Sequence, residues 1–294
     1  MNKSSSRKGV QKTPPDTEEA ENFVEDEDNK SSQNKAGKMS EDSDKHLSNG
    51  KKTYKVCREC CDEFSKLIQE KNVKHVALFT HAFPDPDALG SLMGMQWLLR
   101  KAFNVESQLF YHGEVSHPQN NAMVNLLDPQ LHKVSEDYKP GDFQLNILCD
   151  TVPKNAGVGD CSVNFDVVID HHKECYINGY KGLMIHVKTG SCSAIVYQLM
   201  SIFCRDTSWF DKDIDQDVKV ATALIAGIYT DTENMMSDDC TELEFSAFQD
   251  LFQYRHSNFL KQIVFFKRPK SWVDLKATAC GEAHIDKSGH AIVG

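Results

Sequence analysis

The sequence predicts an α/β fold, a doubly wound and mostly parallel sheet, from three observations. Short apolar runs rich in Val, Ile and Leu alternate with longer segments whose apolar residues recur at helical spacing. Strands that alternate with helices form parallel sheets with helices on both faces. Acidic and imidazole side chains directly follow several of the apolar runs. Ligands of such sheets bind beyond the carboxyl ends of the strands, so we expect the functional site at that edge.

The individual elements follow from these patterns. In chain order, the predicted strands are 74–81, 107–112, 144–150, 165–172 and 182–187. The predicted helices are 54–70, 87–103, 120–127, 191–204 and 216–231. Residues 1–52 precede them and are rich in Ser, Asn, Lys, Asp and Glu. Such a segment buries too little apolar surface to offset its ordering entropy, so we expect a disordered polar tail.

Composition limits the classes of partner. The formal net charge of −10 argues against a scaffold for duplex nucleic acid, which usually carries a basic face. No signal peptide and no apolar run of membrane-spanning length is evident, so we expect a protein that binds no membrane.

The 10 cysteines have no spacing typical of secreted disulfide frameworks, and we therefore expect a reduced, cytoplasmic protein. Cys57, Cys60 and Cys61 suggest a zinc knuckle, but no second Cys or His pair lies nearby. We interpret these three residues as thiols on a helix surface.

Strand and helix ends carry the candidate site. His81, Asp85 and Asp87 follow the first strand, Asp150 follows the third, and Asp170, His171 and His172 follow the fourth. Asp231 ends the apolar segment 223–231. Taken singly, each has a structural explanation, such as a turn in "PDPD" or a helix cap at Asp150. Their joint occurrence at strand and segment ends favours one common site.

We expect this site to bind two divalent metals. Buried carboxylates without compensation cost several kcal/mol each. Oxygen ligands with some imidazole suit Mn²⁺ or Mg²⁺ better than thiolate-preferring ions. Two such metals activate a water and clamp a phosphoryl group during in-line displacement.

The motifs "HAFPDPDALGS", "ILCD", "VVIDHH" and "AGIYTDT" resemble, in this order, those of the DHH phosphoesterase superfamily. The superfamily includes RecJ-type exonucleases, nanoRNases, cyclic-dinucleotide phosphodiesterases and manganese-dependent inorganic pyrophosphatases. The resemblance covers roughly residues 70 to 270. "PDPDALGS", "GSCSAIVYQLM" and "TELEFSAFQDLF" resemble its nanoRNase/RecJ-like branch.

The resemblance implies a role for each site residue. His81, Asp85 and Asp150 would bind one manganese ion, and Asp87, Asp150, His171 and Asp231 the other, with Asp150 bridging. Mg²⁺ is the alternative ion. His172 would contact the substrate phosphate and Asp170 would orient the histidines, and these two residues are the predicted catalytic pair.

Members of this branch continue into a second domain with a "GGGH"-type substrate motif, which is not found here. We therefore expect a catalytic domain at 53–255 and a linker at 256–275. The start of a truncated or reduced second (DHHA1-like) domain is expected at 276–294, with "DKSG" as a hairpin turn. In the linker, Lys267 and Arg268 are the predicted substrate-binding cations, although a solvated hinge also explains them.

The predicted function is hydrolysis of a small phosphorylated nucleotide by a water activated by two metals. The substrate would be a short oligoribonucleotide, a cyclic dinucleotide product or a 3′,5′-bisphosphate. A pyrophosphatase or polyphosphatase on the same metals is one alternative, and an inactive nucleotide-binding module is another. Whether the chain forms a homodimer stays open.

Overall fold

A computed structural model describes residues 55–156, 163–173, 179–206, 209–285 and 291–292. The chain divides into two units, residues 1–51 and 52–294. The first unit, which contains nearly all of the predicted tail, lies outside the described residues.

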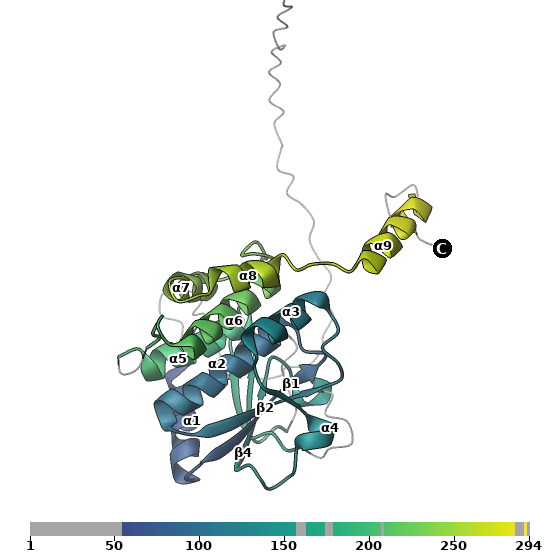
Figure 1. Cartoon of the computed structure of the whole chain (residues 1–294). Helices are drawn as coiled ribbons and strands as arrows, with labels where there is room; N and C mark the ends of the chain where they lie inside the picture. The colour runs from purple at the N-terminus through teal and green to yellow at the C-terminus, as the bar shows by residue number, and fades with distance from the viewer. Residues whose placement is uncertain (1–54, 157–162, 174–178, 207–208, 286–290, 293–294) are drawn as a thin grey trace, which may run out of the picture. The chain divides into compact units, whose positions relative to one another are not determined.

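Six strands form one sheet, and every neighbouring pair is parallel (Figure 1). They are β1 (His75–Ala82), β2 (Glu106–His112), β3 (Leu131–Lys133), β4 (Leu145–Cys149), β5 (Val167–Asp170) and β6 (Leu183–His186). The predicted α/β class and parallel sheet are confirmed, and the five predicted strands are β1, β2, β4, β5 and β6.

The strand order is β3-β2-β1-β4-β5-β6, so the chain reverses its direction of travel between β1 and β4. After β1 it adds strands on one side, and from β4 onward it adds them on the other. This reversal leaves a crevice at the carboxyl ends of β1 and β4, which is where open α/β sheets bind ligands. His81 is the penultimate residue of β1, and Asp150 directly follows β4. The topology therefore brings two predicted ligands to the switch point.

Most helices pack on one face of the sheet, around a large apolar core (Figure 1). The helices are α1 (Arg58–Glu70), α2 (Pro86–Phe103), α3 (Pro118–Leu127), α5 (Cys192–Cys204), α6 (Asp215–Asp231), α7 (Glu242–Leu251) and α8 (Ser257–Val264). The central helix, α2, contacts both α5 and α6 and is buried along most of its length.

The opposite face of the sheet is covered by short elements and aromatic rings. Two short helices connect strands of the sheet: α4 (Val134–Asp137) lies between β3 and β4, and the 3₁₀ helix η1 (Pro153–Asn155) lies between β4 and β5. Phe79 is central, with its ring 5.3 Å from Phe110, 5.1 Å from Tyr138 and 5.4 Å from Phe165. Such edge-to-face and stacked pairs add to the free energy gained from burial.

The packed body extends beyond residue 255, because α8 buries Leu260 and Ile263 against the core. The region predicted as a linker thus contains α8 and the start of α9 (Lys270–Glu282), which buries none of its residues. Strand β7 (His284–Ile285) pairs antiparallel with β8 (Ala291–Ile292), as the expected hairpin requires. That this hairpin begins a second domain stays a prediction, and the "DKSG" turn lies outside the described residues. None of the described helices combines the length and apolar character of a membrane span.

The cysteines of α1 depart from the expected helix-surface thiols. The helix begins at Arg58, four residues later than predicted, so Cys57 is its N-cap. Cys57 and Cys60 are joined by a disulfide, and Cys61 is a buried free thiol. In the described part of the chain, the His, Cys, Asp and Glu groups arranged to hold a metal do not include these cysteines.

Candidate metal centre

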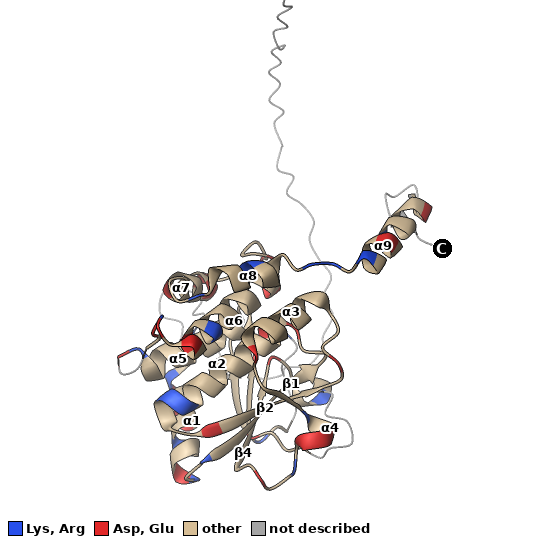
Figure 2. Cartoon of the chain, viewed as in Figure 1, with Lys and Arg blue, Asp and Glu red and all other residues tan. Residues whose placement is uncertain are grey.

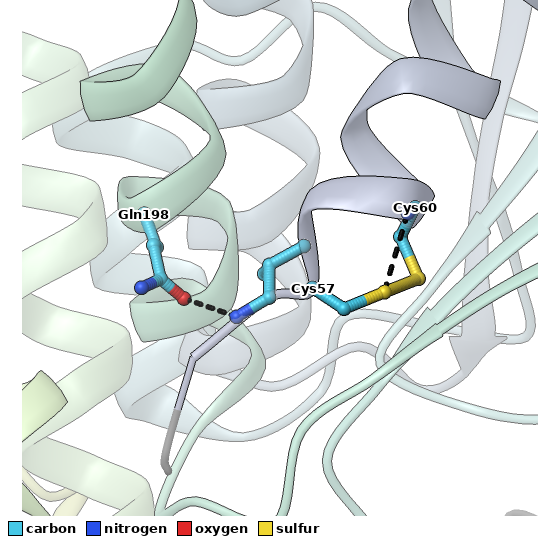
Figure 3. The surroundings of a disulfide bond; sticks show 4 residues. Cys57, Cys60 and Gln198 are labelled. Atoms are coloured by element: carbon cyan, nitrogen blue, oxygen red, sulfur yellow. Dashed lines mark hydrogen bonds between the residues drawn. A yellow bond between two sulfur atoms is a disulfide. The ribbon is translucent and has the colours of Figure 1, made fainter. Parts of the chain in front are cut away.

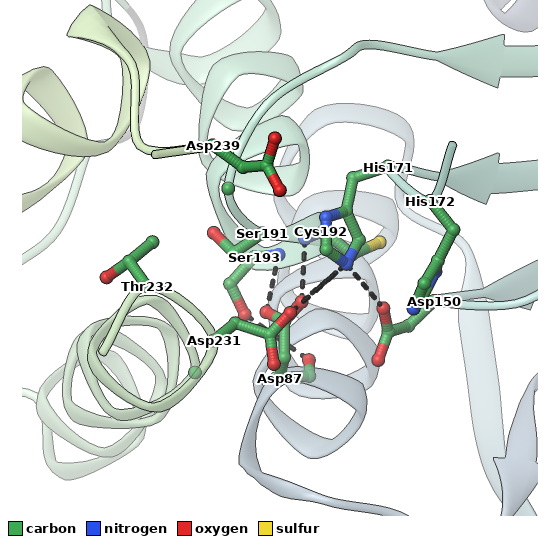
Figure 4. A network of polar contacts seen from close by, with 12 residues as sticks. Asp87, Asp150, His171, His172, Ser191, Cys192, Ser193, Asp231, Thr232 and Asp239 are labelled. Atoms are coloured by element: carbon green, nitrogen blue, oxygen red, sulfur yellow. Dashed lines mark hydrogen bonds and ion pairs between the residues drawn. The ribbon is translucent and has the colours of Figure 1, made fainter. Parts of the chain in front are cut away.

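The predicted ligands converge at the carboxyl edge of the sheet. His81, Asp85 and Asp150 form one group, and Asp87, His171 and Asp231 form a second, with the donor atoms of each group within 4.8 Å of one another. Figure 4 shows the ring of His171 between Asp150 on one side and Asp87 and Asp231 on the other. Sequence positions 150 residues apart, His81 and Asp231, are thus brought to one site.

Asp85 and His81 are oriented by local backbone contacts. Asp85 is the N-cap of α2, and its Oδ1 accepts hydrogen bonds from the backbone N–H groups of Asp87 and Ala88, both at 3.0 Å. Its other oxygen, Oδ2, faces His81 Nε2 at 4.0 Å. The His81 Nδ1 atom lies 2.8 Å from the Ala82 carbonyl, which leaves Nε2 as the atom turned to the site. The "PDPD" motif therefore caps α2 and also carries two of the predicted ligands.

Asp150 lies between the two groups. Its Oδ2 is 3.6 Å from His81 Nε2 and its Oδ1 is 3.4 Å from His171 Nε2. The residue is buried and has a left-handed backbone with φ 62°. Asp tolerates this region better than most residues, because its short side chain can hydrogen-bond locally. The turn directs the carboxylate of Asp150 between the histidines instead of continuing the strand.

His171 is held from behind by a carbonyl. Its Nδ1 lies 3.1 Å from the Thr189 carbonyl oxygen, so the ring presents Nε2 to the carboxylates. Nε2 is 3.2 Å from Asp231 Oδ2 and 3.8 Å from Asp87 Oδ2. A ligating imidazole commonly donates its second N–H to a carbonyl in this way, which fixes the tautomer.

The Thr189 loop is in turn supported by α7. Buried Glu244 Oε1 accepts hydrogen bonds from Thr189 Oγ1 at 2.6 Å and from the Gly190 N–H at 3.0 Å. Its Oε2 accepts from the Thr241 N–H and hydroxyl, both at 2.7 Å, in the capping box of α7. The position of His171 therefore depends on a carboxylate that is far from it in sequence.

Asp87 is fully buried where α2, α5 and α6 meet. Its Oδ2 accepts the Cys192 N–H at 2.7 Å and its Oδ1 accepts the Ser193 N–H at 2.8 Å, both from the first turn of α5 (Figure 4). The positive end of the helix dipole also favours a carboxylate there. Close packing requires Gly227, where an added Cβ would lie 2.9 Å from the Asp87 Cα.

Asp170 orients only one of the two histidines. Its Oδ1 lies 2.7 Å from His172 Nδ1 and accepts the His171 and His172 backbone N–H groups. The side chain of His171 is oriented by Thr189 instead. Because Nδ1 contacts Asp170, Nε2 is the ring nitrogen of His172 that remains available to a ligand, and the side chain is 57% exposed.

The arrangement fits divalent cations. Asp150 Oδ1 and His171 Nε2 are buried, yet neither forms a hydrogen bond with a described residue, although they lie 3.4 Å apart. Buried polar atoms without partners are rare in native structures. Two ligands of one ion with bonds of about 2.1 Å lie roughly 3.0–3.4 Å apart. The contacts of His171 with Asp150 and Asp231 match this spacing.

The charges of the site are strongly coupled. Burial would lower the pKa of His171, but its contacts with Asp150 and Asp231 raise it to about 12. Burial likewise opposes the effect of Asp150 on His81, whose pKa rises to about 9. Burial, with Asp150 and Asp231, raises the pKa of Asp87. Without cations, protonated histidines compensate the carboxylates, and bound cations would displace those protons.

Two cavities meet at this site. The larger, of about 420 Å³, is lined by His171, His172, Lys173, Lys188 and Asp239 among others. The smaller, of about 390 Å³, is lined by His81, Asp85 and Asp150 among others. The two share Thr151, Asn155, His172 and Asp231 in their walls. A molecule in either cavity would contact His172.

The basic residues of the walls are not those predicted. Lys188 and Lys173 line the larger cavity, and Lys173 Nζ lies 3.0 Å from Asp239 Oδ2. Lys267 and Arg268 lie between α8 and α9, in the blue segment of Figure 2, and line neither cavity. The guanidinium of Arg268 lies 4.7 Å from the Trp272 ring centroid. Their role in substrate binding stays a prediction.

Phe83 is a further candidate that sequence reasoning missed. It lies between His81 and Asp85 with φ 57°, and its side chain is 60% exposed. A bulky residue in the left-handed region is a true outlier, and such strain clusters at functional sites. The loop is fixed on both sides, because the Phe83 N–H donates to the His112 carbonyl and Asn120 donates to the Pro84 carbonyl. The sequence contains one signal for this residue, because Phe83 is a large apolar residue within the motif "HAFPDPD" that carries the candidate ligands.

Known proteins resemble this chain over part of its length. An uncharacterized protein of Methanocaldococcus jannaschii is 28% identical over 203 residues, which is 69% of this chain and 39% of that protein. A "Probable manganese-dependent inorganic pyrophosphatase" of Streptococcus pyogenes is 24% identical over 159 residues, 53% of this chain and 48% of that protein. The chain thus spans less than half the length of these relatives.

A solved structure has the same fold. The exopolyphosphatase-related protein of Bacteroides fragilis superposes with a TM-score of 0.65 over 80% of this chain and 68% of its own, at 15% sequence identity. The model of the DHH family, N-terminal domain, matches residues 75–228, which is more than half of the 294 residues. That range contains β1 to β6 and all of the candidate metal ligands except Asp231. The chain therefore belongs to the DHH family.

Proposed function

We propose that this chain is a metal-dependent phosphoesterase that hydrolyses a small phosphorylated nucleotide at the centre described above. The observation that carries the proposal is the convergence of His81, Asp85 and Asp150 with Asp87, His171 and Asp231 at the switch point. Hydrolases of phosphate esters use such carboxylate and imidazole clusters to hold two ions. The match to the DHH family supports the same chemistry.

The ions proposed are manganese, with Asp150 shared between them. Oxygen and imidazole donors suit Mn²⁺, and the S. pyogenes relative is named as manganese-dependent. Bound there, the ions would lower the pKa of a water molecule and offset the charge of a phosphoryl group. The residues of the chain determine where the phosphate lies and which protons are available to it.

His172 is the proposed donor to the phosphate. Its hydrogen bond to Asp170 raises its pKa, which favours the protonated ring near neutral pH. It lines both cavities, so a phosphate on either side of it is within reach. Lys188 and Lys173 add positive charge to the larger cavity, and a phosphate there would compete with Asp239 for Lys173.

Phe83 is the residue proposed to favour a nucleotide over pyrophosphate as substrate. Its exposed ring lies against Gly113, next to the smaller cavity, whose lining includes the neighbouring Ala82 but not Phe83 itself. Stacking of a base on an aromatic ring contributes about 1–3 kcal/mol by alanine substitution, and pyrophosphate has no base. Phe83→Ala should therefore raise KM for a nucleotide by roughly 5- to 150-fold and leave pyrophosphate hydrolysis unchanged. Phe245→Ala is the matched control, because that ring is 57% exposed on α7.

A comparison of four substrates tests the proposal directly. The purified chain with Mn²⁺ is offered 5′-pApA, 3′-phosphoadenosine-5′-phosphate, a cyclic dinucleotide and pyrophosphate side by side, and released phosphate and mononucleotide are measured. We expect cleavage of a nucleotide that is lost in His171→Ala and kept in His132→Ala, since His132 lies in β3 outside both cavities. Release from pyrophosphate alone would support the second candidate, a pyrophosphatase, which the S. pyogenes relative favours. No release from any of the four substrates would contradict both.

A further inference from the structure

We propose that Cys57 and Cys60 form a thiol–disulfide exchange site, with Cys57 as the exchanging sulfur and Cys60 as its resolving partner. The substrate class is a thiol, either of low molecular mass or on another protein. The site is independent of the metal centre and of the function proposed for it. Figure 3 shows the pair at the start of α1, with Gln198 of α5 beside it.

The two cysteines differ in the way that exchange requires. Cys57 is exposed and forms the N-cap of the 13-residue helix α1, whereas Cys60 is half-buried one turn later. Cys57 Sγ accepts a hydrogen bond from the Cys60 N–H at 3.2 Å. Helix N-termini and the Cys-x-x-Cys arrangement both stabilise a thiolate. After reduction, Cys57 would therefore be the accessible thiolate.

The surroundings keep the pair together when the bond opens. On its N-terminal side, the Val56 N–H donates to Gln198 Oε1 at 2.7 Å, and Val56 is 8% exposed. On its C-terminal side, Phe64 and Ile68 are buried in the main core. The helix start is thus anchored without the disulfide, so reduction should leave the two sulfurs near each other. Ring closure then orders little additional chain.

Cys61 does not compete as a partner. It is buried, and burial together with Asp62 raises the pKa of its thiol. The adjacent cysteine therefore stays protonated and inaccessible, although the sequence "CRECC" places it beside the pair.

The exchange balances as two sulfur displacements. The thiolate of the external thiol attacks Cys57 Sγ, the S–S bond breaks, and Cys60 leaves as a thiolate that takes up a proton. A second external thiolate attacks the outer sulfur of the mixed disulfide and releases Cys57 as a thiolate. The protein disulfide gains two electrons, and the two external thiols leave as one disulfide. Of the two protons that these thiols release, one is taken up by Cys60 and the other passes to solvent, while Cys57 stays a thiolate. Oxidation is the reverse sequence.

Redox titration of the full chain tests the pair. The protein is equilibrated in buffers of reduced and oxidised glutathione, acid-quenched, labelled with a maleimide and weighed as intact protein. We expect two labels to be lost together as the buffer becomes more oxidising, and no such paired loss in Cys57→Ser or Cys60→Ser. A pair that stays oxidised in excess dithiothreitol, or stays fully labelled in oxidised glutathione, would overturn the proposal.

Single-cysteine kinetics assign the roles. In Cys60→Ser, glutathione should attach to Cys57, and in Cys57→Ser it should attach to Cys60 more slowly. Cys280 of α9 is the internal reference, an exposed free cysteine with no cysteine one turn away, and Cys280→Ser removes its signal. A helix N-terminus increases the thiolate fraction of Cys57 near neutral pH, and this outweighs the lower nucleophilicity of a stabilised thiolate. Cys57 should thus react faster than Cys280, and an equal or slower rate would refute its assignment as the exchanging sulfur.

Discussion

Replacing Asp150 by Asn tests the centre most sharply, because Asp150 contacts both histidines. Its carboxylate lies 3.6 Å from His81 Nε2 and 3.4 Å from His171 Nε2. Asn has the same shape and also tolerates the left-handed backbone at φ 62°. The substitution therefore removes the charge with little change in packing, whereas Ala would add backbone strain.

In the metal-free protein, the loss of this charge should lower stability in a pH-dependent way. The pKa of His81 is raised from 6.5 to about 9, mainly by Asp150 against the effect of burial. A raised histidine pKa stabilises the fold fully below pH 6.5, and the stabilisation is lost as pH rises through 9. At about 1.4 kcal/mol per pKa unit this is at most about 3.5 kcal/mol for His81 alone. Asp150→Asn also removes the repulsion between Asp150 and Asp87, which offsets part of this loss. We therefore expect the free energy of unfolding of the variant to be lower by about 2 kcal/mol at pH 6.

Urea unfolding of the metal-free variants at pH 6 and pH 9.5 measures this difference. The difference in stability between the wild-type chain and Asp150→Asn should be smaller at pH 9.5 than at pH 6. It should not disappear, because the pKa of His171 is raised to about 12 and the wild-type chain still has the charged contact between His171 and Asp150 at pH 9.5. Asp128→Asn is the matched control, since Asp128 is also left-handed, with φ 50°, but exposed at the end of α3. Equal stability of the two variants at pH 6 would refute the compensating role of Asp150.

Calorimetric titration with Mn²⁺ tests the bridge itself. Losing one partner of a buried charged contact costs about 2–5 kcal/mol, which is at least roughly 30-fold in affinity. For a shared ligand, this loss should apply to both ions in Asp150→Asn. If one ion still binds as in the wild-type chain, Asp150 serves a single ion and the bridging assignment is wrong.

Three further substitutions have distinct expected outcomes. Cys192→Ser should leave metal stoichiometry and hydrolysis unchanged, since only the backbone N–H of Cys192 contacts Asp87, and a marked loss would contradict this. Glu244→Ala should weaken manganese binding roughly 10- to 100-fold by releasing the Thr189 loop, measured by calorimetry, and unchanged affinity would show that the loop needs no support. Gly227→Ala should destabilise the chain by about 1–3 kcal/mol in urea, because the new Cβ meets Asp87, and wild-type stability would mean that the helices relax freely.

The strands and the positions of the candidate ligands were predictable because the apolar periodicity of the sequence agrees with the burial in the structure. Strands such as Val167–Asp170 are short apolar runs, and the polar residue that ends each run marks the carboxyl edge. Elements with few residues escaped prediction. Strand β3 has three residues, Leu131–Lys133, too few for an alternating pattern, and α4 has four. The predicted linker includes α8, because the basic segment that follows this short helix is typical of a solvated hinge, although the apolar face of α8 packs in the core.

Side-chain partners were harder to predict than positions. His171 and His172 are neighbours in sequence, yet one is held by the Thr189 carbonyl and the other by Asp170. Nothing in a strand-end tripeptide distinguishes these two environments, because the carbonyl comes from a loop 18 residues later. The start of α1 raised a similar difficulty. An error of one helical turn there changed Cys57 from a surface thiol into an N-cap bonded to Cys60.

Asp87 explains why the centre is organised before any cation binds. Both of its oxygens already accept N–H groups from the first turn of α5, and Asp85 caps α2 with one oxygen while the other faces His81. The carboxylates are thus fixed by secondary structure, and the helices are fixed by the carboxylates. Binding an ion then requires proton release from His171 and His81 more than movement of the chain. Manganese affinity should consequently increase with pH while the fold stays constant, a combination that a centre assembled by induced folding would not show.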